Sequence, residues 1–251
     1  MKQITDNTTE GKDKINNNAM IEFEKEVAML DKFRNDYIVH FFGAVFIPSK
    51  ICMVTEYALY GSIQDLMKKY PVFTDLTLNL RTKLLLDAAK GIKYLHDNGI
   101  LHRDIKPDNF LIVSLEENIP VNAKLTDFGA TRNVNQMMTN MTFTKGIGTP
   151  AYMAPEILNR EHYKKPADMF SFAVTMLEVV IWGDAYPKTL YTFAWNIADL
   201  VSCGKRTQTI TYIEDDGIKQ LIEDCWTQDP KERPMMDSVI QRLNKLWEDA
   251  N

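Results

Sequence analysis

The first quarter of the chain has the hydrophobic pattern of a small mixed unit. Residues 5–18 are polar and rich in asparagine, which is typical of a connection without a core of its own. Apolar residues near helical spacing then predict a helix over 21–33. Two runs rich in β-branched and aromatic residues, 40–47 and 51–57, predict a hairpin that turns at the proline-containing residues 48–50. We therefore expect one helix and a few antiparallel strands here.

The middle of the chain predicts one short and one long helix, followed by two short strands. Ser62 is a suitable cap for a helix that runs to about Lys69. Leucine and alanine recur at three and four residues over 76–96, so we expect one long helix there, stopped by Asn98 and Gly99. Two strand-like runs, 110–113 and 123–125, flank a polar insertion. 

The last part of the chain reads first as a loop and then as helices. Residues 131–148 have no periodicity, which predicts a long loop, and loops of that length are usually functional or disordered. Four further segments have the apolar spacing of amphipathic or buried helices, at about 167–182, 190–201, 215–226 and 235–248. The pattern therefore indicates a small helix-plus-hairpin unit followed by a larger helical unit.

Composition agrees with a soluble globular protein. Of the 251 residues, 45% are hydrophobic and 25% are charged, which is close to the average for folded domains. The net charge of −5 gives no reason to expect a nucleic-acid partner. Three widely spaced cysteines indicate neither a disulfide framework nor a zinc site. No apolar run is long enough for a membrane segment, and no secretory signal is evident, so we expect a cytoplasmic protein or the cytosolic part of a membrane protein.

Three short motifs carry the candidate chemistry. His102, Arg103 and Asp104 are followed by Lys106 and Asn109, then by Asp-Phe-Gly at 127–129 and Ala-Pro-Glu at 154–156. Each motif alone could be an ordinary turn or strand end. Together and in this order they resemble the motif set of protein kinases.

The resemblance implies a reaction and assigns its residues. A protein kinase transfers the γ-phosphoryl group of ATP, and catalysis consists mainly of positioning and charge stabilisation. By resemblance, Asp104 accepts the substrate hydroxyl proton, and Lys106 lies near the transferred phosphoryl. Asn109 and Asp127 are the expected ligands of Mg²⁺, which prefers hard oxygen donors. Lys106 is typical of kinases that phosphorylate serine or threonine of protein substrates.

Further positions have the expected structural residues of the family. Thr149 is expected to bridge Asp104 and Lys106. Asp168 resembles the buried helix aspartate that holds the catalytic loop. Residues 225–234 resemble the CWxxDPxxRP segment of the tyrosine-kinase-like group. Arg233 of that segment is expected to pair with Glu156, and a stack of Leu30, His102 and Phe128 is implied, although each of these three could equally be plain core.

The nucleotide site is implied by resemblance in the first part of the chain. Glu26 is the candidate acid of the regulatory helix, with a solvated helix acid as the alternative. Thr55 is the expected gatekeeper at the start of a hinge that bonds adenine through its backbone, and Leu111 is the expected floor under adenine. The expected adenine-binding hinge comprises Thr55, Glu56, Tyr57 and Ala58.

The sequence departs from the family at the roof of this site. No GxGxxG occurs in the chain, and Lys2 is the candidate for the strand lysine that contacts ATP, although a lysine after the first methionine is commonplace. We expect a portion of a longer active kinase. The alternatives are a kinase-like scaffold or binding module with an impaired site, and a helical interaction protein whose motifs coincide by chance.

The resemblance also predicts the domain layout and the regulation. The expected fold is α+β and bilobal, with a truncated N-lobe of few antiparallel strands and one helix over 1–57, and a mainly helical C-lobe over 58–251. The segment between Asp127 and Glu156 has candidate phosphorylation sites for an upstream kinase, where added charge would order the loop against Arg103. A threonine-containing flexible loop is the alternative. The candidate sites are Thr139, Thr142 and Thr144.

Overall fold

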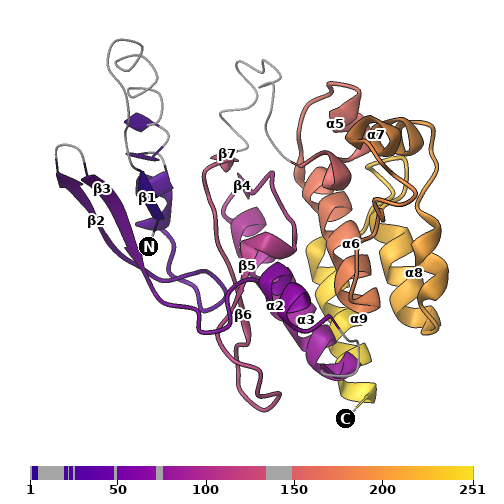
Figure 1. The fold of residues 1–251 in the computed structure, drawn as a ribbon, viewed down its shortest axis with the longest axis horizontal. Helices are drawn as coiled ribbons and strands as arrows, with labels where there is room; N and C mark the ends of the chain where they lie inside the picture. Colours follow the sequence, from indigo (N-terminus) through magenta and orange to yellow (C-terminus); the bar gives the residue numbers. More distant parts are fainter. Residues whose placement is uncertain are drawn as a thin grey trace.

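The computed structural model of the chain describes most of its residues. The described residues are 2–4, 20–21, 23–24, 26–47, 50–71, 76–133 and 149–250. A small three-stranded sheet lies to one side of a larger helical body (Figure 1). This arrangement confirms the predicted α+β fold with a small strand-containing lobe and a mainly helical lobe.

The sheet has the order β1-β3-β2, and both of its pairings are antiparallel. Strand β1 (Lys2–Ile4) pairs with β3 (Lys50–Thr55), and β3 forms a hairpin with β2 (Phe41–Ile47). The hairpin was predicted, and its β-branched and aromatic composition explains why these residues pair. A helical stretch over 20–30, described except for 22 and 25, precedes it, as the apolar spacing also predicts.

Two helices follow the sheet and begin with side-chain caps. Helix α2 (Ile63–Lys69) starts at Ser62, whose hydroxyl accepts the N–H of Asp65 while the Asp65 carboxylate accepts the N–H of Ser62. Helix α3 (Leu78–Asp97) starts at Thr77, whose hydroxyl accepts the N–H of Leu80. Past its last turn, Gly99 has a φ of +68°, the left-handed conformation that favours glycine.

The centre of the helical body is α6 (Lys165–Ile181), which is buried along nearly its whole length. It packs against α3 and against α8 (Asp216–Cys225), and α9 (Met236–Asp249) packs along α3 (Figure 1). Helices α5 (Pro155–Leu158) and α7 (Ala194–Ser202) contact each other near one end of α6. 

Short strands and turns connect the sheet to the helical body. Strand β5 (Phe110–Ile112) pairs with β6 (Ala123–Leu125), and β4 (Ile100–Leu101) pairs with β7 (Arg132–Asn133). A 3₁₀ turn, Pro107–Asn109, lies between β4 and β5. The segment between β4 and β5 and the segment between β6 and β7 therefore lie next to each other, and they contain the motifs at 102–109 and 127–129.

Two of the sequence predictions need correction. Helix α7 begins at Ala194, whereas apolar spacing placed its start near residue 190, because Leu190 and Phe193 are exposed and do not face a core. The predicted structureless loop over 131–148 begins with β7, a strand of two residues that is too short to show a period. The rest of that loop, 134–148, lies outside the described residues.

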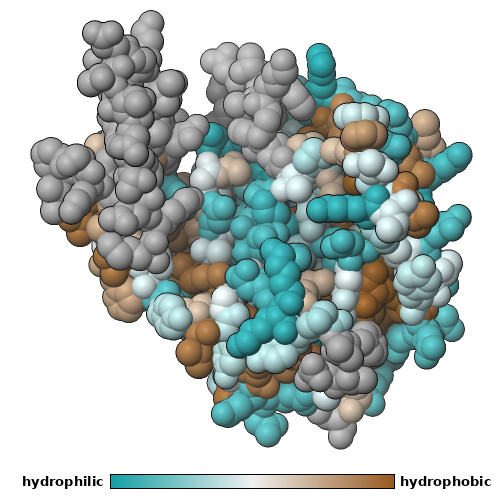
Figure 2. Space-filling model, in the orientation of Figure 1, coloured by the Kyte–Doolittle hydropathy of each residue, from teal (hydrophilic) through white to brown (hydrophobic). Residues whose placement is uncertain are grey.

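The surface visible in Figure 2 is mixed, with hydrophilic side chains over much of the helical body and scattered hydrophobic ones. Among the described residues, no helix combines the length and the hydropathy that crossing a membrane requires.

Candidate active site

The loop that contains His102 and Arg103 is held by a buried carboxylate. Asp168, in the first turn of α6, accepts the backbone N–H of His102 at 3.1 Å and that of Arg103 at 2.9 Å. Arg103 has a φ of +73°, a conformation that costs a non-glycine residue free energy unless its surroundings impose it. Asp168 supplies that constraint, which is the arrangement the sequence resemblance predicts.

Two further side chains complete the contacts of Asp168. His96 Nε2 lies 2.9 Å from Asp168 Oδ2, and the Tyr163 hydroxyl donates to Oδ1 at 2.9 Å. Burial alone would raise the pKa of this carboxyl, but the hydrogen bond with His96 and the backbone N–H of Arg103 hold its pKa below the ordinary value. Neither His96 nor Tyr163 was identified from the sequence. Each lies in a segment without a recognisable motif, so no sequence signal marked them.

Four polar side chains meet at the start of the 3₁₀ turn. Lys106 Nζ lies 2.7 Å from Asp104 Oδ2 and donates to Thr149 Oγ1 at 3.0 Å. The Thr149 hydroxyl is 3.3 Å from Asp104 Oδ1, and Asn109 Nδ2 donates to Asp104 Oδ2 at 3.1 Å. The structure thus brings together Asp104, Lys106, Asn109 and Thr149, although Thr149 is 45 residues from Asp104 in the sequence.

The Asp-Phe-Gly motif lies beside this group. The carbonyl oxygen of Asn109, the last residue of the 3₁₀ turn, accepts the backbone N–H of Thr126 at 3.0 Å. Thr126 directly precedes Asp127, so this bond ties the Asp-Phe-Gly motif to the turn. Asp127 has a φ of +61°, so its backbone is also in the left-handed region. The two candidate magnesium ligands are therefore attached to adjacent, hydrogen-bonded segments.

An aromatic stack lies behind the motif. The ring of His102 packs edge-on against Phe128 at 5.6 Å, and its Nε2 lies 2.9 Å from Thr126 O. The ring of Phe33 also packs against Phe128, with ring centroids 5.1 Å apart. Phe128 and Leu30 are both buried, and Phe33 is a ring partner of Phe128 that the sequence did not suggest.

Glu26 reaches the same region from the helical stretch over 20–30. Glu26 is only 8% exposed. Its carboxylate lies close to Gly129: if that glycine had a Cβ atom, the atom would lie 3.9 Å from Glu26 Oε2 and 3.5 Å from Asp127 Oδ1. The acid therefore faces the Asp-Phe-Gly motif instead of solvent. The backbone of Lys2 pairs with Met53 on β3, while its side chain lies outside the described part of the chain. 

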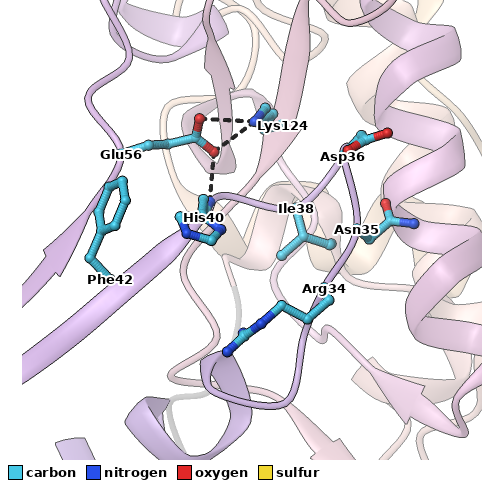
Figure 3. Close-up of a pocket in the computed structure, with 8 residues that line it drawn as sticks. All are labelled: Arg34, Asn35, Asp36, Ile38, His40, Phe42, Glu56 and Lys124. Carbon is cyan, nitrogen blue, oxygen red and sulfur yellow. Dashed lines mark hydrogen bonds and ion pairs between the residues drawn. The ribbon is translucent and has the colours of Figure 1, made fainter.

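The predicted hinge follows β3 directly. Thr55 is the last residue of β3, Tyr57 is exposed, and Ala58 is buried. Leu111 lies on β5 and bridges to Ser62 near the start of α2. The Glu56 side chain points away from this segment, toward Lys124 on β6 (Figure 3).

Glu156 and Arg233 form a buried ion pair. The two guanidinium Nη atoms contact the two carboxylate oxygens at 2.7 and 2.8 Å, and Arg233 also donates to the carbonyl groups of Pro166 and Thr227. The Arg233 guanidinium lies over the ring of Phe170, 5.2 Å from its centroid. This pair joins α5 to the loop before α9, as the sequence resemblance predicts.

A second buried carboxylate holds the segment after Thr149 and was missed in the sequence. Glu178 of α6 accepts the hydroxyl of Tyr152 at 2.6 Å and the N–H of Ala185 at 3.1 Å. Burial raises the pKa of Glu178 to about 7, against the opposing effect of these hydrogen bonds. The Ser171 hydroxyl also donates to the carbonyl of Tyr152, so α6 fixes this segment at two points.

Some predicted features lie outside the described residues or have no direct counterpart among them. Thr139, Thr142 and Thr144 fall in 134–148, which the structure does not describe. Among the described residues, no three His, Cys, Asp or Glu side chains gather as a metal site. Asn109 and Asp127 nevertheless fit a hard cation, because both offer oxygen atoms and the amide nitrogen of Asn109 is already engaged by Asp104.

Comparison with known proteins agrees with the fold. The family described as "Protein kinase domain" matches residues 1–243. The chain therefore belongs to the protein kinase family, whose members use ATP as phosphoryl donor. This membership excludes the alternative in which the motifs coincide by chance.

Several relatives are serine/threonine kinases by description. The chain is 32% identical to "Probable serine/threonine-protein kinase gdt9" of Dictyostelium discoideum, over 92% of this chain and 16% of the relative. It is 34% identical to "Serine/threonine-protein kinase STY17" of Arabidopsis thaliana, over 93% of this chain and 39% of the relative. For drkA of D. discoideum the identity is 32%, over 92% of this chain and 34% of the relative. The chain thus spans well under half the length of each of these proteins.

Proposed function

We propose that the chain is the catalytic portion of a kinase that transfers the γ-phosphoryl group of Mg²⁺-ATP to serine or threonine of protein substrates. The observation that supports this proposal best is the group formed by Asp104, Lys106 and Thr149. Lys106 and Thr149, which come from two distant segments, both contact the carboxylate of Asp104, and this arrangement suits phosphoryl transfer to an alcohol.

In the proposed reaction the substrate hydroxyl attacks the γ-phosphorus, and the bond between that phosphorus and the ADP oxygen breaks. Asp104 accepts the hydroxyl proton. Lys106, which already contacts Asp104, offsets negative charge on the transferred group. Thr149 orients both side chains and ties them to the segment before Tyr152, along which a substrate peptide would lie.

The metal is assigned to Asn109 and Asp127. Mg²⁺ supplies electrostatic stabilisation of the phosphates when it is bound. The backbone hydrogen bond between Thr126 and Asn109 supports this assignment, because it keeps the two segments that contain the ligands at a fixed separation.

The remaining assignments follow the predicted division of the chain into two lobes. We place the N-lobe in 1–57 and the C-lobe in 58–251, with adenine against Thr55 to Ala58 and Leu111. Glu26 is proposed as the partner of Lys2, which its burial next to Gly129 supports. Phosphorylation of Thr139, Thr142 or Thr144 by an upstream kinase remains a proposal, as does membership of the tyrosine-kinase-like group, which residues 225–234 support.

The test uses a longer chain in which a glycine-rich loop precedes Met1. We expect phosphorylation of a generic serine/threonine substrate that requires Mg²⁺ and ATP. Asp127→Ala should abolish metal-dependent nucleotide binding, whereas Asp104→Asn should abolish transfer and leave binding intact. Equal phosphate incorporation by wild type and both variants would contradict the assignment.

The alternative function is a kinase-like scaffold, in which the helical body binds partners without transferring phosphate. A scaffold would show no transfer even in the longer chain, while its helical body would still fold and bind partners.

A further inference from the structure

An ion pair behind the hinge connects the small sheet to the helical body. Lys124 Nζ on β6 lies 2.8 Å from both carboxylate oxygens of Glu56, the residue after β3 (Figure 3). The two side chains are only 16% and 22% exposed. Glu56 Oε1 also accepts the backbone N–H of His40 at 2.6 Å. One carboxylate therefore joins three segments of the chain.

His40 and Glu56 are the two ends of the β2–β3 hairpin. His40 O accepts the N–H of Glu56 at 2.9 Å, and the Glu56 carboxylate accepts the N–H of His40. These two hydrogen bonds join His40 to Glu56 at the open end of the hairpin, which we call its root. Lys124 fastens this closed root to β6. Without Lys124, Glu56 would still close the hairpin, but the link from its carboxylate to β6 would be lost.

Strand β6 is itself well fixed and leads into the active site. Leu125 exchanges backbone hydrogen bonds with Tyr37 at 2.8 Å and Val39 at 2.9 Å, immediately before His40. Asp127 follows Leu125 by two residues. The ion pair therefore connects the end of the hairpin, where we place adenine, to the strand that positions a proposed metal ligand.

The pair lies at the edge of an open surface hollow of about 620 Å³ (Figure 3). Arg34, Asn35 and Asp36 line one side of it, and Phe42 lines another. The described residues on this side therefore border open space next to the pair.

We propose that Glu56 and Lys124 are positioning residues whose ion pair sets the angle of the hairpin relative to β6 and thereby the affinity for nucleotide. The inference rests on the proposed function, because it assigns the nucleotide to the hinge. An exposed ion pair contributes little on its own, but this pair is largely shielded and is linked to a backbone donor. 

The experiment measures binding of Mg²⁺ and a fluorescent N-methylanthraniloyl ATP to the full chain. Lys124→Met should raise the dissociation constant about fivefold, or about 1 kcal/mol at 1.4 kcal/mol per tenfold. Lys124→Arg keeps the charge and should bind within about twofold of wild type. Adding Glu56→Gln to Lys124→Met should cause little further loss, because residues that act as a pair are not additive.

Controls separate positioning from general destabilisation. Arg242→Met removes an ion pair of similar length that links α9 to Asp224 of α8, remote from the hinge, and it should leave nucleotide affinity unchanged. Amide hydrogen exchange over 40–55 should accelerate in Lys124→Met and not in Arg242→Met. Unfolding midpoints show whether either variant has lost global stability.

Several results would overturn the inference. Unchanged affinity and exchange in Lys124→Met, tighter nucleotide binding in that variant, or strictly additive effects of the two substitutions would each do so. If wild type binds no nucleotide, the proposed function fails and so does the nucleotide half of the inference. The exchange measurement then still decides whether the pair holds the hairpin root.

Discussion

Replacing Asp168 with asparagine should strongly destabilise the fold while changing almost no volume. Asp168 Oδ2 contacts the N–H of His102 and His96, and Oδ1 contacts the N–H of Arg103 and the hydroxyl of Tyr163. An asparagine has one oxygen, so in either orientation its NH₂ group faces a backbone N–H. One donor is left without an acceptor in a fully buried position.

The magnitude follows from these contacts. A buried donor without a partner costs about 1–3 kcal/mol, and hydrogen bonds to a charged group contribute about 1.5–3 kcal/mol each. The Tyr163 hydroxyl can rotate to accept from the new amide, so we expect a total loss of about 3–5 kcal/mol of unfolding free energy. Urea denaturation at neutral pH measures this loss. A matched control is Asp237→Asn, which removes an exposed acid paired with Lys93 and should cost below about 1 kcal/mol.

The pH dependence of Asp168→Asn gives a second check. The pKa of Asp168 is lowered in the folded state, so its stabilisation is present above the ordinary carboxyl pKa of 3.8 and is lost as pH falls below that value. The difference in unfolding free energy between wild type and variant should therefore narrow below about pH 4. A loss of under about 1 kcal/mol at neutral pH would refute the reasoning, because it would mean that the loop does not depend on the carboxylate.

Two other buried carboxylates give separate predictions. Burial raises the pKa of Glu178 to about 7 from 4.5. The unfolding free energy of wild type should therefore fall by up to about 3 kcal/mol as pH rises from 5 to 8, and that of Glu178→Gln should fall less over the same range. Parallel pH profiles from urea denaturation would contradict the burial argument. Arg233→Met leaves Glu156 buried without its partner and should cost about 3–5 kcal/mol, whereas the further substitution Glu156→Met should recover part of that loss. Thermal unfolding of the three proteins tests this, and equal midpoints for both variants would count against it.

Local sequence patterns predicted the elements whose chemistry is local. Ser62 and Asp65 form the reciprocal cap that a serine before a helix favours, and α3 ends where Gly99 supplies a left-handed residue. The start of α7 was misplaced because Leu190 and Phe193 have helical spacing but are exposed, and a pattern cannot distinguish exposed apolar residues from buried ones. Strands of two residues, such as β7, cannot show a period of two.

The candidate site was also predicted only in part. The order of the motifs predicted that Asp104, Lys106 and Asn109 lie together. The family resemblance predicted that Thr149 lies next to them. The pairs Tyr152–Glu178 and Glu56–Lys124 were not predicted, since they join surfaces of elements that are 26 and 68 residues apart in the chain. A single sequence does not indicate which polar side chains face each other across a fold.

The central claim is that the carboxylate of Asp104, held by Lys106 and Thr149, serves transfer of phosphate to serine or threonine. The most direct measurement is phosphoamino-acid analysis of a protein substrate after incubation with Mg²⁺ and labelled ATP, comparing wild type with Asp104→Asn in the longer chain. The account predicts phosphoserine or phosphothreonine from wild type and, since a positioned base typically contributes about 10²- to 10⁴-fold, a loss of that size in a variant that still binds ATP. Equal incorporation by Asp104→Asn, or label found on tyrosine alone, would contradict it.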